Sequence, residues 1–143
     1  MNLLSSFKKI FILGIGGSGM SSIAKYLKQK GHDVEGYDQR ISYITNLLES
    51  DGVKTFQDLD DFRYQKDVLY IISSAINLED TFLANYYKNE NVISRPKFLE
   101  LLSEEVEIIG ITGTHGKTST TALVSHIFPV SYTHLTLPTS KIV

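Results

Sequence analysis

A short apolar run followed by a glycine-rich loop constrains the fold of this chain most strongly. Lys9 to Leu13 is a run of buried-strand type, and the next residues, Gly14 to Met20, match the pattern G-x-G-x-x-G. Apolar residues then recur at spacings of three and four up to Leu27, which predicts a helix that stops at Gly31. His32 to Tyr37 alternates as a second strand. This order predicts a parallel βαβ unit that binds a nucleotide diphosphate.

The glycines of this loop are expected to have separate tasks. Gly14 allows a tight turn, Gly16 the close approach of a pyrophosphate, and Gly19 the packing of the helix on the strand. Asp38 lies nineteen residues after Gly19, where an acidic residue often holds a ribose hydroxyl. The alternative is that Asp38 belongs to a surface turn. The residues predicted to bind the nucleotide are Gly14, Ile15, Gly16, Gly17, Ser18, Gly19 and Met20 at the diphosphate and Asp38 at the ribose.

The chain continues to alternate between helix and strand patterns up to about residue 102. We expect a helix at 41–48 closed near Gly52, a short strand at 53–56 and a buried strand at 67–72. Asn77 is expected to cap a helix with aromatic side chains at 82–87 on its core face. A brief strand at 92–93 and a helix opened by Arg95 and Pro96 complete the pattern. The fold class is therefore α/β, with a Rossmann-like parallel sheet.

Several polar residues of this region have two open interpretations. Ser73 and Ser74 follow a buried strand, where small hydroxyl residues either reach a bound nucleotide or sugar, or form an ordinary turn. Arg95 is either a contact to an anionic ligand or a solvated charge. The acidic cluster at 58–61 favours a solvated loop over a metal site, because no histidine at a fixed spacing supports metal binding.

A second phosphate-gripping loop is predicted further along the chain. The β-branched run from Val106 to Ile111 predicts a strand, and Gly113 and Gly116 let the backbone turn its N–H groups toward an anion. Lys117 brings a positive charge to the phosphates, and the Thr118 hydroxyl is placed to bind Mg²⁺. A helix from about 117 to 128 directs its positive dipole end to the same anion. The match to the general pattern is imperfect, because Ile111 occupies the position of its first glycine.

Two phosphate-binding loops would crowd each other in one small sheet, so the second loop is expected to open another domain. The acidic stretch from Ser103 to Glu107 marks the boundary. We therefore expect a Rossmann-like domain at 1–105, the truncated start of a P-loop ATPase domain at 106–128, and a separate tail at 129–143.

Composition excludes several classes of protein. The chain has 143 residues, a formal net charge of −2 and no cysteine. This charge gives no electrostatic case for binding nucleic acid or an anionic membrane. No apolar run approaches the ~20 residues that span a bilayer. The absence of cysteine excludes disulfides and fits a cytoplasmic protein.

Three motifs together carry a resemblance to the Mur ligases. Gly14 to Met20, Ser73 to Ile76 and Gly113 to Thr118 occur in the order and spacing of that family, and the resemblance covers about Lys8 to Phe128. It implies that UDP-N-acetylmuramate is held by the first loop with Asp38, Ser73 and Ser74. It implies that ATP is held by Gly113, Thr114, His115, Gly116, Lys117, Thr118 and Ser119.

The resemblance also implies a reaction. ATP phosphorylates the muramyl carboxylate to an acyl phosphate, which the amine of L-alanine attacks. Lys117 and Thr118 are the implied catalytic residues, Lys117 by neutralising the transferred phosphate and Thr118 by binding Mg²⁺. His115 is a residue typical of the family members that add L-alanine, whereas members for later amino acids usually carry Asn or Ser there.

The chain departs from the family after Phe128. Residues 129–143 are interpreted as an artefact joined to a truncated gene, with a native disordered tail as the alternative. The 143-residue chain is expected to lack a complete active site and to be inactive alone. Two rival functions remain open: an NAD-binding oxidoreductase or sensor, which leaves the second loop unexplained, and a stand-alone nucleotide-binding module.

Overall fold

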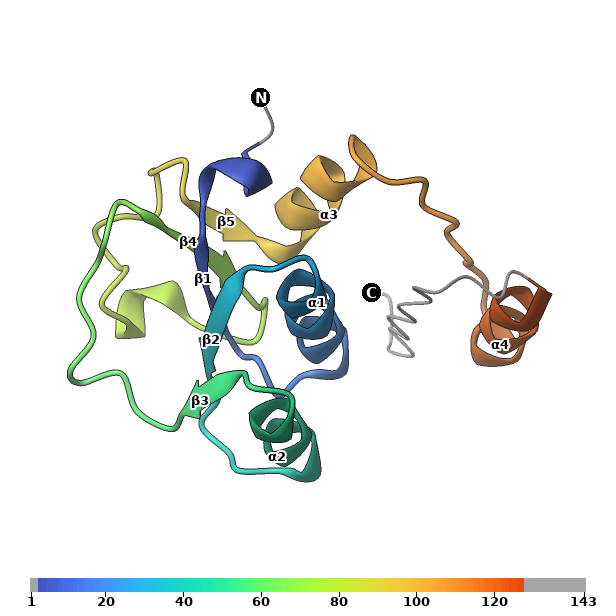
Figure 1. The fold of residues 1–143 in the computed structure, drawn as a ribbon, viewed down its shortest axis with the longest axis horizontal. Helices are drawn as coiled ribbons and strands as arrows, with labels where there is room; N and C mark the ends of the chain where they lie inside the picture. The colour runs from blue at the N-terminus through green and yellow to red at the C-terminus, as the bar shows by residue number, and fades with distance from the viewer. Residues whose placement is uncertain (1–2, 128–143) are drawn as a thin grey trace.

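Five parallel strands form one sheet at the centre of the protein (Figure 1). The computed structural model describes residues 3–127. The strands are β1 (Lys9–Leu13), β2 (Asp33–Tyr37), β3 (Lys54–Phe56), β4 (Val68–Ile72) and β5 (Val92–Ser94), in the spatial order β3-β2-β1-β4-β5. Leu13 of β1 lies in register with Tyr37 of β2 and Ile72 of β4. The parallel sheet predicted from the apolar runs is therefore confirmed.

Helices and turns connect the strands. The structure has α1 (Ser18–Gln29), α2 (Tyr43–Ser50), α3 (Arg95–Ser103) and α4 (Lys117–Ile127), with 3-10 turns η1 (Leu4–Ser6) and η2 (Leu78–Asp80). The Ser42 side chain caps α2 in a capping box with Thr45, and Ser94 caps α3. Gly31 and Gly52 follow α1 and α2 with φ of +93° and +85°, as expected of glycines that end helices. The predicted helices at these places are confirmed, up to residue 127 for the last.

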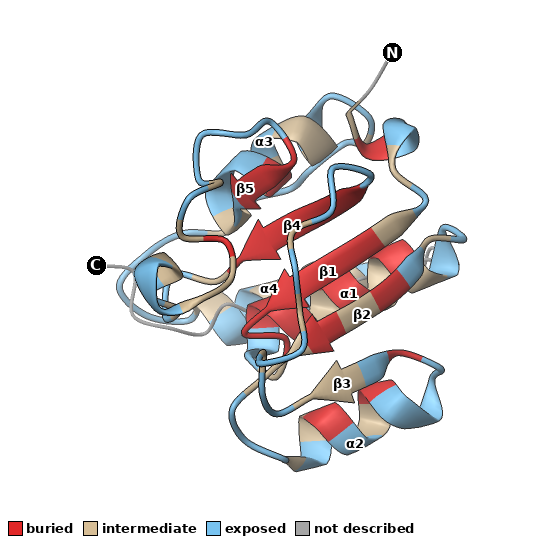
Figure 2. Ribbon diagram, turned by 90° about the vertical axis from the view of Figure 1, so that its left-hand side faces the viewer, coloured by how far each residue is buried: buried red, intermediate tan, exposed pale blue. Residues whose placement is uncertain are grey.

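The two faces of the sheet are covered differently (Figure 2). Alternate residues such as Ile10 and Ile12 pack with α1, with Leu48 of α2 and with Phe98 of α3. The opposite face carries Phe11, Leu13, Tyr70 and other side chains that pack against the long connections after β3 and β4. Because side chains alternate across a strand, both faces are apolar, as a buried parallel sheet requires.

The expected helix after Asn77 is wrong. Only η2 is helical there, and the following residues form successive turns, in which the amide of Tyr86 donates to the carbonyl of Leu83 at 2.8 Å. The Thr81 hydroxyl accepts from the Leu83 amide at 3.1 Å, so a side chain takes over a backbone bond. Leu83 and Tyr86 pack against the sheet, while Tyr87 is 58% exposed. Successive turns, rather than a helix, thus bury most of the aromatic side chains at 82–87.

The expected strand from Val106 to Ile111 is also wrong. Residues 107–113 have no regular secondary structure, and Ile108 and Ile109 are 49% and 60% exposed. A strand needs a neighbouring strand to satisfy its backbone groups. The five strands of the described chain all lie between residues 9 and 94, and none pairs with this segment.

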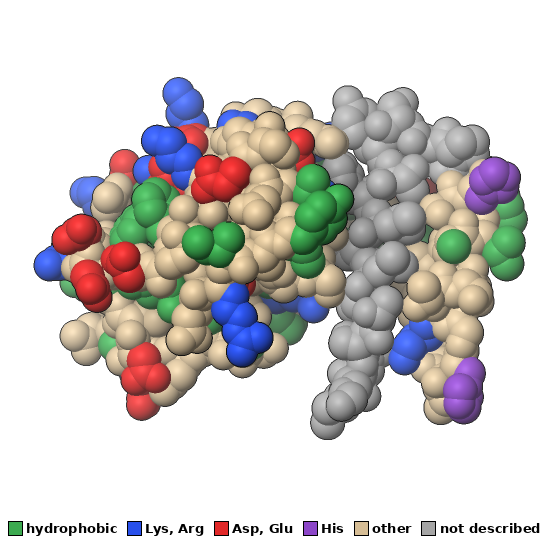
Figure 3. Space-filling model, turned by 90° about the horizontal axis from the view of Figure 1, so that it is seen from below, with side chains coloured by type: hydrophobic (Ala, Val, Ile, Leu, Met, Phe, Trp, Pro, Cys, Tyr) green, Lys and Arg blue, Asp and Glu red, His purple; other side chains and the backbone are tan. Residues whose placement is uncertain are grey.

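The surface carries charges of both signs. Figure 3 shows acidic and basic side chains together on one face of the sheet domain. Within residues 3–127, no helix is both long and apolar enough to cross a bilayer.

Candidate functional site

The residues that follow four of the strands meet at one edge of the sheet. Because all strands are parallel, their carboxyl ends lie together, and they deliver Gly14, Asp38, Ser73 and Arg95 to this edge. The strand order reverses between β1 and β4, and open α/β sheets bind ligands at such a switch point. The structure therefore brings together the predicted residues of the first loop, Asp38, Ser73 and Ser74.

The glycine loop makes the predicted tight turn after β1. Gly14 has a φ of +84°. The amides of Gly14 and Ile15 both donate to the carbonyl of Tyr37, at 2.7 and 3.0 Å. A Cβ on Gly14 would lie 2.7 Å from the Cβ of Ser73. A larger residue at position 14 would thus separate the loop from the end of β4.

The carboxylate of Asp38, which is partly buried, hydrogen-bonds to the glycine loop. Its Oδ2 accepts from the amide of Gly16 at 2.9 Å, and its Oδ1 accepts from the amide of Arg40 at 3.0 Å. A Cβ on Gly16 would lie 2.7 Å from Oδ2. The carboxylate therefore holds the loop and also closes a turn with Arg40, as the turn interpretation expects, while its contact to a ribose hydroxyl stays a prediction.

The amino-terminal end of α1 offers unpaired donors at this edge. The cap residue is Gly17, which supplies no side-chain acceptor, and the first turn contains no acidic residue. The amides of Ser18, Gly19 and Met20 have no acceptor among the described residues. A helix end of this kind attracts anions through its free N–H groups and its dipole.

Arg95 lies beside the same helix end. A Cβ on Gly19 would be 2.6 Å from Cζ and 2.7 Å from Nη2 of Arg95. The expected task of Gly19 was to let the helix pack on the strand, but the atoms nearest to it are those of the guanidinium. The Nε of Arg95 is buried and has no hydrogen-bond partner within the described chain. Arg95 is therefore a half-buried cation at the candidate site, not a fully solvated charge.

Ser73 and Ser74 line a hollow at the carboxyl ends of β4 and β5. This cavity has a volume of about 360 Å³ and is also lined by Tyr87, Ser94 and Pro96. The hydroxyl of Ser73 accepts from the amide of Ala75 at 3.3 Å, so it also serves the local turn. Ser94 and Pro96, the two chain neighbours of Arg95, both line the cavity.

The second loop has glycines at the turns that a phosphate-binding loop needs, but most of its residues are exposed. Gly113 and Gly116 have φ of +148° and +75°. Lys117 is half-buried as the first residue of α4, while Thr118 and Ser119 are exposed. No residue of α4 is buried. The glycines and Lys117 fit a triphosphate, but residues 3–127 contain no cluster of three acidic or histidine side chains that could hold a metal.

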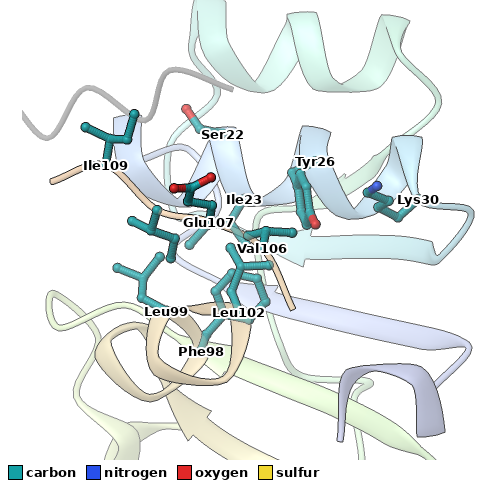
Figure 4. Close-up of a pocket in the computed structure, with 11 residues that line it drawn as sticks. Ser22, Ile23, Tyr26, Lys30, Phe98, Leu99, Leu102, Val106, Glu107 and Ile109 are labelled. Atoms are coloured by element: carbon teal, nitrogen blue, oxygen red, sulfur yellow. The ribbon is translucent and has the colours of Figure 1, made fainter. Parts of the chain in front are cut away.

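A further cavity lies between α1, α3 and residues 106–109 (Figure 4). Its volume is about 320 Å³, and Ile23, Phe98 and Leu102 contribute to its apolar wall. None of the residues predicted to bind a nucleotide lines it. The acidic cluster at 58–61 lies in a loop far along the chain from these sites, with Asp58 accepting from the Asp60 amide at 3.3 Å.

Comparison of the sequence with protein-family models identifies the family of this chain. Residues 9–113 match the model of the Mur ligase family, catalytic domain. The chain belongs to the Mur ligase family.

Two individual relatives within this family are ligases with the same name. The chain is 38% identical over 122 residues to the UDP-N-acetylmuramate–L-alanine ligase of a Hydrogenobaculum species, covering 85% of this chain and 27% of the relative. It is 30% identical over 142 residues to the ligase of the same name from Christiangramia forsetii, covering 89% and 30%. The chain thus spans less than a third of the length of these relatives.

Two solved structures have the same fold. The UDP-N-acetylmuramate-alanine ligase of Thermotoga maritima aligns with a TM-score of 0.70 and 31% identity, over 85% of this chain and 29% of that one. A UDP-N-acetylmuramate:L-alanyl-gamma-D-glutamyl-meso-diaminopimelate ligase from Neisseria meningitides also aligns with a TM-score of 0.70, at 27% identity, over 86% and 40%.

Proposed function

We propose that this chain is the UDP-sugar-binding end of an ATP-dependent ligase that joins L-alanine to UDP-N-acetylmuramate. One observation carries the proposal: the glycine loop, Asp38, Ser73 and Arg95 converge at the switch point of a parallel sheet in a Mur ligase chain. The names of the relatives support the choice of L-alanine.

The first loop receives the uridine diphosphate in this proposal. The amides of Ser18 to Met20 supply the free backbone N–H groups, and Asp38 holds the loop in shape through Gly16. Ser73 and Ser74 contact the ligand from the end of β4. The hollow beside them is large enough to take part of a sugar.

The second loop binds the triphosphate of ATP through Gly113 to Ser119. Lys117 neutralises the phosphate that is transferred, and the Thr118 hydroxyl is one ligand of Mg²⁺. Further metal ligands and the adenine pocket come from residues that the described chain does not contain. We place the domain boundary at 105/106, because residues 107–113 have no regular secondary structure and α4 buries no side chain.

The reaction has two steps. A carboxylate oxygen of UDP-N-acetylmuramate attacks the γ-phosphorus of ATP, and ADP leaves. The amine of L-alanine then attacks the carbonyl carbon of the acyl phosphate, inorganic phosphate leaves, and the amine gives up a proton as the amide forms. Such a transfer depends on positioning of the reactants and neutralisation of the phosphate charge. We place the reaction in the cytoplasm.

Ligand binding by the 143-residue chain tests the first half of this function. Isothermal titration should give tighter binding of UDP-N-acetylmuramate than of NADH. Tighter binding of NADH would instead favour a nicotinamide-dependent protein. The chain alone should form no product from ATP, UDP-N-acetylmuramate and L-alanine.

Lys117→Ala tests the second half in a chain extended to the length of its relatives. Release of phosphate in the presence of both substrates should be lost, while the affinity for UDP-N-acetylmuramate should not change, because the two loops belong to different domains. Equal loss of turnover and of UDP-sugar affinity would contradict the two-domain assignment.

A further inference from the structure

Two positive features of the fold converge on one place without an acidic partner. The first is the end of α1, where three amides lack acceptors and no acidic residue lies in the first turn. The second is the guanidinium of Arg95, which lies against Gly19 in that same turn. Among residues 3–127, neither the salt bridge between Lys9 and Glu35 nor the one between Lys97 and Glu100 involves Arg95.

From this arrangement we infer that Arg95 is the side-chain ligand of the diphosphate, and that position 19 is glycine to admit Arg95. The inference rests on the proposed binding of a uridine diphosphate at this edge. A guanidinium beside a positive helix end is unfavourable unless an anion bridges the two. A diphosphate supplies several acceptor oxygens and a charge that satisfies both groups at once.

The position of Arg95 is determined by its own secondary structure. Ser94 caps α3 by accepting from the amide of Lys97 at 3.3 Å, and Pro96 stands in the first turn. The backbone of Arg95 is therefore held at the carboxyl end of β5, and its guanidinium lies against Gly19 in the first turn of α1. The buried Nε, without a partner among residues 3–127, shows that the side chain is directed inward rather than into solvent.

Arginine fits this task better than lysine would. Its planar group can donate two parallel hydrogen bonds to a phosphate and stays charged at every relevant pH. The Nε can donate to one phosphate oxygen while an Nη donates to a second. Such a charge-assisted pair is worth roughly 1.5 to 3 kcal/mol, which corresponds to about a 10- to 100-fold change in affinity.

The first test compares UDP with uridine as ligands of the full 143-residue chain. Arg95→Ala should weaken UDP binding by about 10- to 100-fold and uridine binding by less than about twofold. Arg95→Lys, which keeps the charge but not the paired donors, should give an intermediate loss. Lys97→Ala is the matched control, because it removes a cation from an exposed position of the same helix, and it should change UDP affinity by less than about twofold. Thermal unfolding of each variant shows whether the domain is intact.

The second test is a double-mutant cycle between Gly19 and Arg95. A methyl group at position 19 would displace the guanidinium, so Gly19→Ala should weaken UDP binding by about tenfold in the wild-type background. In the Arg95→Ala background the same change should cost less than about twofold. Equal costs in both backgrounds would show that Gly19 acts independently of Arg95.

The outcomes separate this inference from the proposed function. If the wild-type chain binds UDP and Arg95→Ala binds it as tightly, the role of Arg95 is wrong while the proposed function stands. A wild-type chain that binds neither UDP nor UDP-N-acetylmuramate overturns both. Equal weakening of uridine and UDP by Arg95→Ala would also overturn the inference, because the effect would then not depend on the phosphates.

Discussion

Substitution of Gly36 by alanine should destabilise the sheet domain through a contact beneath the glycine loop. Gly36 pairs with Ile12 in the register of β2 and β1. A Cβ on Gly36 would meet the Cδ1 of Ile15, and would lie 2.8 Å from the Cβ of Ile15 and 2.7 Å from the carbonyl oxygen of Ile12. Ile15 is completely buried. The added methyl group can therefore be accommodated only if Ile15 or the backbone of β1 moves.

The size of the effect follows from these contacts. Overpacking a well-packed core costs about 1–3 kcal/mol, and the upper part of that range applies because one contact is a backbone atom. Alanine recovers about 0.5–1 kcal/mol because glycine is costlier to order in a strand. The net loss is about 2 kcal/mol, which lowers the melting temperature of a domain of this size by roughly 8–16 °C.

Thermal and urea unfolding of the whole chain, followed by far-ultraviolet circular dichroism, measures this loss. Ile15→Val removes the Cδ1 that the new methyl group meets, so it should reduce the cost of Gly36→Ala without removing it. Gly31→Ala is the control: apart from its own chain neighbours, no residue among 3–127 has an atom within 4 Å of its Cβ, and its φ of +93° adds backbone strain alone. Its cost should not depend on Ile15. A loss for Gly36→Ala within the roughly ±0.5 kcal/mol of an ordinary surface substitution would refute this reasoning.

Two further predictions concern side-chain hydrogen bonds outside the candidate site. Asn91→Leu should cost about 1–3 kcal/mol in urea unfolding, because the buried Asn91 amide donates to the Val68 carbonyl at 2.8 Å and accepts from the Tyr64 hydroxyl at 2.9 Å; an unchanged midpoint would contradict this. The side-chain hydrogen bond from Thr55, followed by its backbone bond, lowers the pKa of Glu49. The ionised Glu49 carboxylate therefore contributes stability above the ordinary carboxyl pKa of about 4.3. This contribution is lost as the pH falls through the lower pKa of the folded state. Thr55→Val should raise that pKa in an NMR titration, and no change would show that the hydroxyl is not its cause.

Much of the fold could be predicted from local patterns in the sequence. The apolar run at Lys9, the helix spacing that ends at Gly31 and the strand before Asp38 each act over a few neighbouring residues. Hydrophobic periodicity and glycine conformation are properties of such short segments. The positions of Gly14 and Asp38 in the candidate site follow from the same patterns, because parallel strands deliver their carboxyl ends to one edge.

The two wrong predictions share a physical cause. The aromatic spacing at 82–87 suits a helix, yet those side chains bury themselves against the sheet from successive turns. The β-branched run from Val106 to Ile111 suits a strand, yet no strand of the described chain pairs with it. In both cases the residues suit the predicted element locally, but the packing partners present in the folded structure determine which secondary structure forms.

The sequence by itself determined the five strands of the sheet, the helices α1 to α4, the glycine loop after β1 and the placing of Asp38 after β2. Those features depend on residues that are close along the chain. Only the tertiary structure decided that Arg95 lies on Gly19 and that Gly36 makes room for Ile15, because these pairs are far apart in sequence and meet through the packing of separate elements. A glycine has no side chain, so the sequence does not show which atom packs against it. That atom is identified only in the assembled structure, where strands and helices are in contact.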